Sequence, residues 1–220
     1  MKLVHVSLQS CFTDEYVNVL QADDPRAFRN FYDDIKNSLC GESDVFIMSD
    51  KDETVNLSKV AIMIDPININ TADKKINTKL IAQLADVAQE KFAKESANIN
   101  DGVNKLLCDL QTESSVEIDW DCESPIAALL KAFGVSLKCD HASHAERLFA
   151  FLTAMTELCS IKCVFFVNLK SCMTQGELSE IYKFLRYNKI FALTLESSLR
   201  DKLEEEFRVI VDKDLCEIVG

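Results

Sequence analysis

The stretch KCVFFVNLKSCMTQGELSEIYKFLRYNKIFALTLE, residues 162–196, predicts a strand, a helix and a second strand in immediate succession. Residues 163–167 form a nearly unbroken apolar run, which is typical of a strand covered on both faces, as in a parallel sheet. Thr174 and Glu177 have the spacing of a capping box, which indicates where the helix begins. A second apolar run at 190–195 completes a βαβ unit, whose crossover we expect to be right-handed. The apolar stripe of the helix is Leu178, Ile181, Tyr182 and Leu185.

Three segments of the chain share a resemblance to one known family. FVNLKSC-MTQGEL-EIYKFLRYNKI within the opening stretch, SPIAALLKAFGVSLK at 124–138 and VNVLQADDPRAFRNFYDDI at 17–35 occur in the family's order. They resemble the small adaptation protein of type II-A CRISPR systems, the second member of the Csn family.

This resemblance implies a non-enzymatic protein that assembles into a ring-shaped homotetramer and threads double-stranded DNA by its ends. It also implies calcium binding near the junction of body and arm, and a role in capturing new spacers. The expected partners are double-stranded DNA, further copies of the chain, the CRISPR integrase complex and the guide-directed nuclease. The family's body is similar to a nucleotide-binding fold that has lost its nucleotide site.

Composition and length fit a soluble globular protein. The chain has 220 residues, of which 48% are hydrophobic and 27% are charged, both ordinary values. Its sequence contains no apolar run near the ~18 residues that a membrane helix needs, and residues 1–10 do not resemble a signal peptide. We therefore expect a cytoplasmic protein without membrane association. The nine cysteines are expected to be free thiols, because their number is odd and no C-x-x-C occurs.

The periodicity predicts an α/β fold: a mixed sheet with flanking helices, plus a projecting α-helical insertion. Residues 1–65 form the first part of the α/β head, 66–114 form the helical arm, and 115–220 form the second part of the head. Within the arm, two helices are expected, broken at 98–102. The head is expected to resume with a strand at 116–120, a helix beginning at Ser124 and a brief strand at 135–137.

Motifs for nucleotide binding and hydrolysis are absent from the sequence. It contains neither G-x-x-x-x-G-K-[ST] nor G-x-G-x-x-G, and its five glycines are widely spaced. We therefore expect no bound nucleotide. Cys139, His141 and His144 lie within six positions, but this group lacks the fourth ligand that structural zinc normally requires.

An acidic group follows the arm. Glu117, Asp119 and Asp121 alternate with apolar residues, so a strand at this position would crowd three carboxylates on one face. Calcium takes six to eight oxygen ligands in irregular geometry and would relieve this repulsion. The alternative is an ordinary solvated strand face. With the family resemblance, the candidate calcium ligands are Glu117, Asp119, Asp121 and Glu123.

The net charge of −12 argues against a generic nucleic-acid binder, whose surface is usually basic. DNA binding would then depend on local basic positions, on a bound cation, or on both. A ring multiplies each basic position by the number of copies, so a few lysines per chain would suffice to line its pore. Lys170 precedes the central helix and is a further basic position. The candidate DNA-binding residues are Lys131, Lys138, Lys183, Arg186 and Lys189.

Three classes of function remain open from the sequence. The first is the non-enzymatic DNA-binding ring. The second is a metal-dependent nuclease that uses the acidic group, since many nucleases hold metal ions on carboxylates. The third is a scaffold that binds other adaptation proteins through its acidic surface and does not contact DNA.

Overall fold

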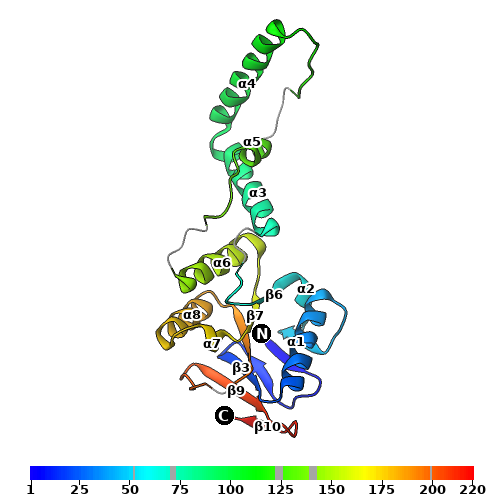
Figure 1. Cartoon of the computed structure of the whole chain (residues 1–220), viewed down its shortest axis with the longest axis vertical. Coiled ribbons are helices and arrows are strands. Elements are labelled where there is room, and N and C mark those ends of the chain that lie inside the picture. The colour runs from blue at the N-terminus through cyan, green and yellow to red at the C-terminus, as the bar shows by residue number, and fades with distance from the viewer. Residues whose placement is uncertain (52, 70–72, 122–125, 139–142, 199) are drawn as a thin grey trace. The chain divides into compact units, whose positions relative to one another are not determined.

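A computed structural model describes residues 1–51, 53–69, 73–121, 126–138, 143–198 and 200–220. The chain divides into an α/β unit, residues 1–70 with 140–220, and a helical unit, residues 71–139 (Figure 1). Residues 115–139, which the sequence pattern assigns to the α/β head, lie in the helical unit.

A six-stranded mixed sheet is the centre of the α/β unit, and its strand order is β10-β9-β3-β8-β7-β6. All neighbouring strands from β9 to β6 pair in parallel, and β10 pairs with β9 in the antiparallel sense. The mixed α/β fold predicted from the sequence is thereby confirmed. Its strands are β3 (Val17–Ala22), β6 (Ala61–Ile64), β7 (Cys163–Val167), β8 (Phe191–Glu196), β9 (Glu206–Val211) and β10 (Glu217–Val219).

The predicted βαβ unit is present as β7, α8 (Gln175–Tyr187) and β8. Thr174 and Glu177 form both hydrogen bonds of the capping box. All four residues of the predicted apolar stripe on α8 are buried, so burial of this stripe fixes the helix on the sheet. A short helix, α7 (Leu169–Cys172), connects β7 to α8.

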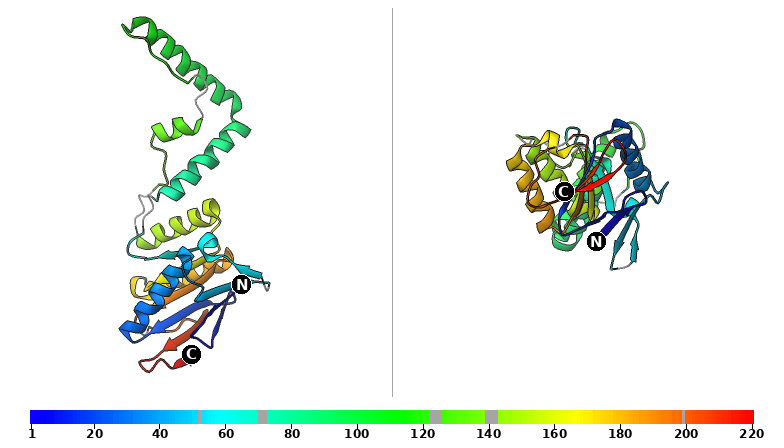
Figure 2. Two further views of the ribbon diagram at one scale, coloured as in Figure 1. Left: turned by 90° about the vertical axis from the view of Figure 1, so that its right-hand side faces the viewer. Right: turned by 90° about the horizontal axis from the view of Figure 1, so that it is seen from below.

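Helices cover both faces of the large sheet. The two views in Figures 1 and 2 place α1 (Pro25–Cys40) on one face and α7 with α8 on the other. Helix α6 (His144–Cys159) packs beside α8, where Phe149 and Phe184 meet edge to face at 5.6 Å. Because β7 lies between these layers, its first four residues are buried.

Helix α1 begins and ends at the positions that the sequence indicates. The Asp24 side chain accepts hydrogen bonds from the amides of Arg26 and Ala27. Gly41 ends the helix with a φ of 75°, a left-handed conformation that glycine adopts at little cost.

A second, four-stranded antiparallel sheet lies on the α1 side, with the order β2-β1-β4-β5. Its apolar residues join one core cluster with α1 and the large sheet. The strands β2 and β5 were not predicted, since three residues are too few for a periodic pattern. The elements are β1 (Lys2–His5), β2 (Cys11–Thr13), β4 (Phe46–Asp50) and β5 (Glu53–Val55), followed by α2 (Leu57–Val60).

The helical unit contains α3 (Lys74–Lys91), α4 (Ala93–Glu113) and α5 (Ile126–Ala132). The predicted pair of long helices is confirmed, but the predicted break at 98–102 is wrong, because these residues lie inside α4. The break lies at Phe92, which caps the end of α3. A single glycine inside a helix costs only about 1 kcal/mol relative to alanine, so Gly102 does not end α4.

Residues 114–121 form no strand, contrary to the prediction. Val116 and Ile118 are 65% and 39% exposed, and the Ile118 amide donates to the Gln111 side chain at 2.7 Å. Trp120 donates to Asn104 of α4 at 3.2 Å, so this segment is attached to α4. Residues 135–137 also form no strand, and the Leu137 amide donates to Asn77 of α3 at 3.2 Å.

A buried network of charged residues lies under α7 and α8. The Lys170 ammonium donates to Glu206 at 2.7 Å and to the Asp201 carbonyl at 2.6 Å. Tyr182 and Arg208 also donate to Glu206, which is 3% exposed. Lys170 is itself 7% exposed, so this basic position is taken up by the buried network and is not at the surface.

The adjacent carboxyl group of Glu196 accepts hydrogen bonds from the Lys170 amide and the Thr194 hydroxyl. Burial raises its pKa, and the hydrogen bond from the Lys170 amide offsets part of that rise. Its ionised form is therefore less favoured than that of an exposed glutamate.

No helix in the described part of the chain is both long and apolar enough to cross a membrane.

Candidate nucleic-acid interface

The predicted DNA-binding residues fall into two groups, one in each unit of the chain. Lys131 lies on α5 and Lys138 follows it, both in the helical unit. Lys183, Arg186 and Lys189 lie on and just after α8 in the α/β unit. All five side chains are exposed.

The exposure of the α8 group follows from the amphipathic pattern of the helix. The buried stripe faces the sheet, so Lys183 lies on the opposite side of the helix and Arg186 lies on its flank, beside the stripe. These two residues are spaced as i and i+3, so their side chains are neighbours. Lys189 follows the helix with a φ of 53°, and its amide donates to the Arg186 carbonyl at 3.0 Å. The three cations therefore lie around one end of α8.

No carboxylate of the described residues lies within ion-pairing distance of Lys183, Arg186 or Lys189. Like charges three or four residues apart on a helix repel each other weakly. An anion such as a phosphate would relieve this repulsion, so the end of α8 is suited to contact a nucleic-acid backbone.

Tyr187 is a neighbour of these cations that the sequence pattern did not single out. It is the last residue of α8 and is 88% exposed. The sequence could have indicated this exposure, because Tyr187 lies off the buried stripe of α8 and therefore does not pack into the core.

The predicted acidic group does not form a calcium site within the described residues. Glu117, Asp119 and Asp121 lie in the segment along α4 and not on a strand, and Glu123 lies outside the described residues. Across the described ranges, no three His, Cys, Asp or Glu side chains are grouped so as to hold a metal ion. The carboxylates described therefore do not fit a preformed calcium site.

The predicted cysteine–histidine group is also only partly described, because Cys139 and His141 lie outside the described residues. The His144 ring lies 2.9 Å from the Arg147 guanidinium. A neighbouring cation of this kind disfavours metal binding by the imidazole.

The carboxyl ends of the parallel strands are where α/β sheets usually bind ligands. At this edge, a hollow of about 360 Å³ lies next to the first turn of α1, and Asp23 and Arg29 are among its lining residues. The Asp24 carboxylate already accepts hydrogen bonds from the Arg26 and Ala27 amides in the first turn of the helix. Those hydrogen bonds hold the pKa of Asp24 below its usual range. A phosphate in the usual position at this helix end would meet a carboxylate in place of free amides.

These features define a mixed α/β protein in which a carboxylate caps the amino terminus of α1, and which carries a helical insertion. Exposed cations at the end of α8 form its candidate nucleic-acid interface. The sequence model of the family CRISPR-associated protein (Cas_Csn2) matches residues 39–215. This match spans most of the chain, so the chain belongs to that family and is a CRISPR-associated protein.

Proposed function

We propose that this protein is a non-enzymatic binder of double-stranded DNA ends in type II-A CRISPR systems. It binds duplex without sequence preference as a calcium-stabilised homotetrameric ring and acts in spacer acquisition, the adaptation step. Its other partners in this proposal are the integrase complex and the guide-directed nuclease.

The exposed cations at the end of α8 are the observation that carries the DNA-binding part. They form no ion pair with the described carboxylates, and they lie on or just after a helix that four buried residues anchor. Contacts from lysine and arginine to phosphates give binding that is independent of sequence and sensitive to salt. An acidic chain can bind DNA in this way if assembly brings several copies of the basic group together.

An apolar stripe on α4 supports the assembly part of the proposal. None of the 21 residues of α4 is buried. Four of its large apolar residues have the alternating spacing of four and three that helices use to pair with other helices. Exposed apolar surface of this kind is costly in a monomer and favours association with further copies. The stripe consists of Ile99, Val103, Leu106 and Leu110, all of which are exposed.

We expect Leu106→Glu to reduce the solution mass of the protein, because a carboxylate in an apolar helix seam must lose its hydration. Light scattering at fixed protein concentration measures this mass. Cys108→Glu is the matched control, since Cys108 is exposed and lies about 180° around α4 from the stripe. An unchanged mass for Leu106→Glu would exclude the α4 stripe from the assembly interface.

The calcium part rests on the family resemblance, since the described carboxylates do not form a site. Calcium at millimolar concentration would stabilise the ring. Its ligands would come together only on assembly, or would include residues outside the described ranges. The role of the ion is thus structural in this proposal.

A gel-shift comparison of linear and covalently closed circular duplex tests the function directly. We expect the linear DNA to shift without being cleaved, the circle to shift weakly, and chelation of calcium to weaken the shift. A closed ring explains the difference, because only a linear duplex has an end that can enter it. Equal shifts of both DNAs would contradict threading, and cleavage would contradict a non-enzymatic role.

A further inference from the structure

The two most exposed large hydrophobic residues in the described part of the chain are both aromatic. Tyr187, the last residue of α8, is 88% exposed, and Phe133, directly after α5, is 79% exposed. A single exposed apolar side chain needs no special explanation, so the surroundings of the two rings decide what they can bind.

Cations surround Tyr187. Lys183 precedes it by four residues, a spacing that makes the two side chains neighbours on one face of the helix. Arg186 is adjacent in the chain, and the amide of Lys189 donates to the Arg186 carbonyl at 3.0 Å. In the described ranges, no carboxylate lies within ion-pairing distance of these three cations. The ring therefore lies among positive charges that the described carboxylates do not neutralise.

The Tyr187 ring is also directed away from the sheet. The 3.6 residues per turn of a helix place it about 170° around α8 from the middle of the buried stripe. The carboxyl end of a helix carries a partial negative charge, which would repel phosphate. Here the amides of Asn188, Lys189 and Ile190 donate to carbonyls of the last turn, and three cations outweigh that partial charge.

Phe133 has a similar setting in the helical unit. Lys131 precedes it by two residues and Lys138 follows it by five, and both lysines are exposed. Gly134 has a φ of 66°, and its amide donates to the Lys131 carbonyl at 3.0 Å, so α5 ends here with the ring in solvent. Two separate helix ends thus carry an exposed aromatic residue close to lysine or arginine.

We propose that Tyr187 and Phe133 stack against unpaired bases at the end of a DNA duplex, so that the protein prefers an end with a single-stranded overhang. Every base has a flat face that an aromatic ring can cover, whatever the sequence. The neighbouring cations contact the phosphates of the same strand. Bases inside a duplex cover each other, so only unpaired bases reach the rings. This inference rests on the proposed DNA binding and names the form of DNA end that the α8 surface recognises.

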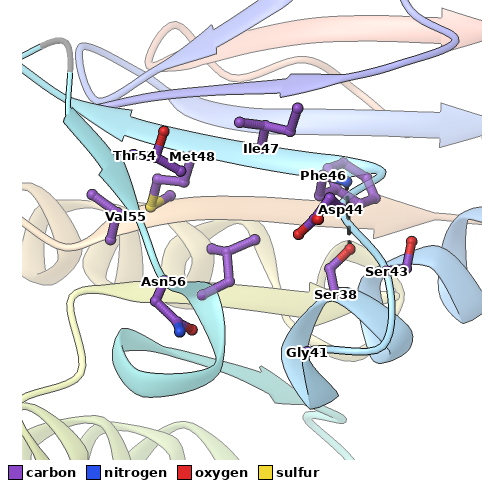
Figure 3. Close-up of a pocket in the computed structure, with 11 residues that line it drawn as sticks. Ser38, Gly41, Ser43, Asp44, Phe46, Ile47, Met48, Thr54, Val55 and Asn56 are labelled. Atoms are coloured by element: carbon purple, nitrogen blue, oxygen red, sulfur yellow. Dashed lines mark hydrogen bonds between the residues drawn. The ribbon is translucent and has the colours of Figure 1, made fainter.

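A groove of about 500 Å³ beside β4 does not provide a competing site for DNA (Figure 3). None of the described residues that line it is basic, and Asp44 among them repels phosphate. Phe46 is 3% exposed, and its amide already donates to the Ser38 hydroxyl, as Figure 3 shows. The exposed helix ends are therefore better suited than this groove to contact a nucleic acid.

Fluorescence anisotropy with the full-length protein compares a labelled blunt duplex with the same duplex carrying a single-stranded overhang of five thymidines. We expect the overhang to raise the affinity about tenfold, a typical effect of stacking a base on an aromatic side chain. Tyr187→Leu and Phe133→Leu should each remove much of this gain and leave the affinity for blunt duplex within about twofold, because neither change alters charge. Tyr187→Phe is the matched control, since it keeps the ring and should bind the overhang within about twofold of the wild-type protein.

Cross-linking locates the stacked bases independently of affinity. Overhang thymines replaced by iodouracil should join to Tyr187 or Phe133 under long-wavelength ultraviolet light, and mass spectrometry of the peptides identifies the residue. Equal affinity for blunt and overhang DNA, or unchanged overhang affinity of both leucine variants, would overturn the inference and leave the proposed duplex binding intact. A change in solution mass caused by both leucine variants would assign the rings to an interface between copies and would also overturn it. Failure of the wild-type protein to bind either DNA would contradict the proposed function itself.

Discussion

Linear duplex DNA should bind about a hundredfold more weakly to the double variant Lys183→Glu, Arg186→Glu than to the wild-type protein at low salt. Both side chains are exposed on α8 beside the buried stripe that anchors the helix. Charge reversal replaces attraction to phosphate with repulsion, and each copy in an assembly repeats the change. Fluorescence anisotropy with a labelled blunt duplex measures the affinity.

The salt dependence separates a direct contact from a general charge effect. Each lost phosphate contact should reduce the slope of log affinity against log salt by about 1. The control is Lys36→Glu, Lys213→Glu, which makes the same change in net charge at two exposed lysines elsewhere in the α/β unit. If this control weakens binding as much as the α8 variant, or if the α8 variant binds normally, α8 does not contact DNA.

Lys170→Met should lower the free energy of unfolding by about 3–5 kcal/mol, the usual cost of removing one partner of a buried ion pair. Methionine fills most of the volume of the lysine, so the loss reports mainly on charge. Glu206 would keep Arg208 and Tyr182 as partners but would lose two hydrogen bonds from the ammonium. Chemical denaturation followed by circular dichroism, at fixed protein and calcium concentrations, measures the change.

Two further variants test whether the ion pairs of Glu206 account for the loss. Lys213→Met alters an exposed lysine and should change stability by less than about 0.5 kcal/mol. Adding Glu206→Gln to Lys170→Met should lower stability further, because the buried Arg208 would then lose its charged partner. A loss below about 1 kcal/mol for Lys170→Met would contradict a role for this pair in holding α7 on the sheet.

Local sequence signals predicted the α/β core well because several independent signals agreed there. In the unit from β7 to β8, an apolar run, a capping box and a helical stripe all indicated the same elements. Helix α1 was equally well marked by Asp24, Pro25 and Gly41. Such agreement between local preference and tertiary packing is what makes a segment predictable.

The errors arose where one local pattern had no such support. Residues 116–120 alternate like a strand, but a strand needs a partner, and this segment bonds instead to Gln111 and Asn104 of the helical unit. The burial of Lys170 had no local signal, since its partners Glu206 and Asp201 lie more than thirty positions away in sequence. The calcium prediction stays untested: the strand expected to align Glu117, Asp119 and Asp121 did not form, but Glu123 lies outside the described residues and the family resemblance is unaffected.

The sequence predicted that the basic side chains are exposed, but it did not predict which of them lie together. The stripe on α8 was sufficient to place Lys183 on the outer side of that helix and Arg186 on its flank. Lys131 and Lys138 belong to the other unit of the chain, which local periodicity had assigned to the head. The groove beside β4 had no sequence signal, because it arises from the short β5 and the turn into α2.

The position of β3 has a consequence for biosynthesis. This early strand lies between β8 and β9, so Leu20 is in register with Leu195 and Val209. A nascent chain must therefore expose β3 without either neighbour until residues 191–211 have been synthesised. By contrast, α3, α4 and α5 depend on contacts within 71–139 and can form while translation continues. We expect the α/β unit to mature only after β8 and β9 have left the ribosome, with chaperones shielding the apolar residues of β3 until then.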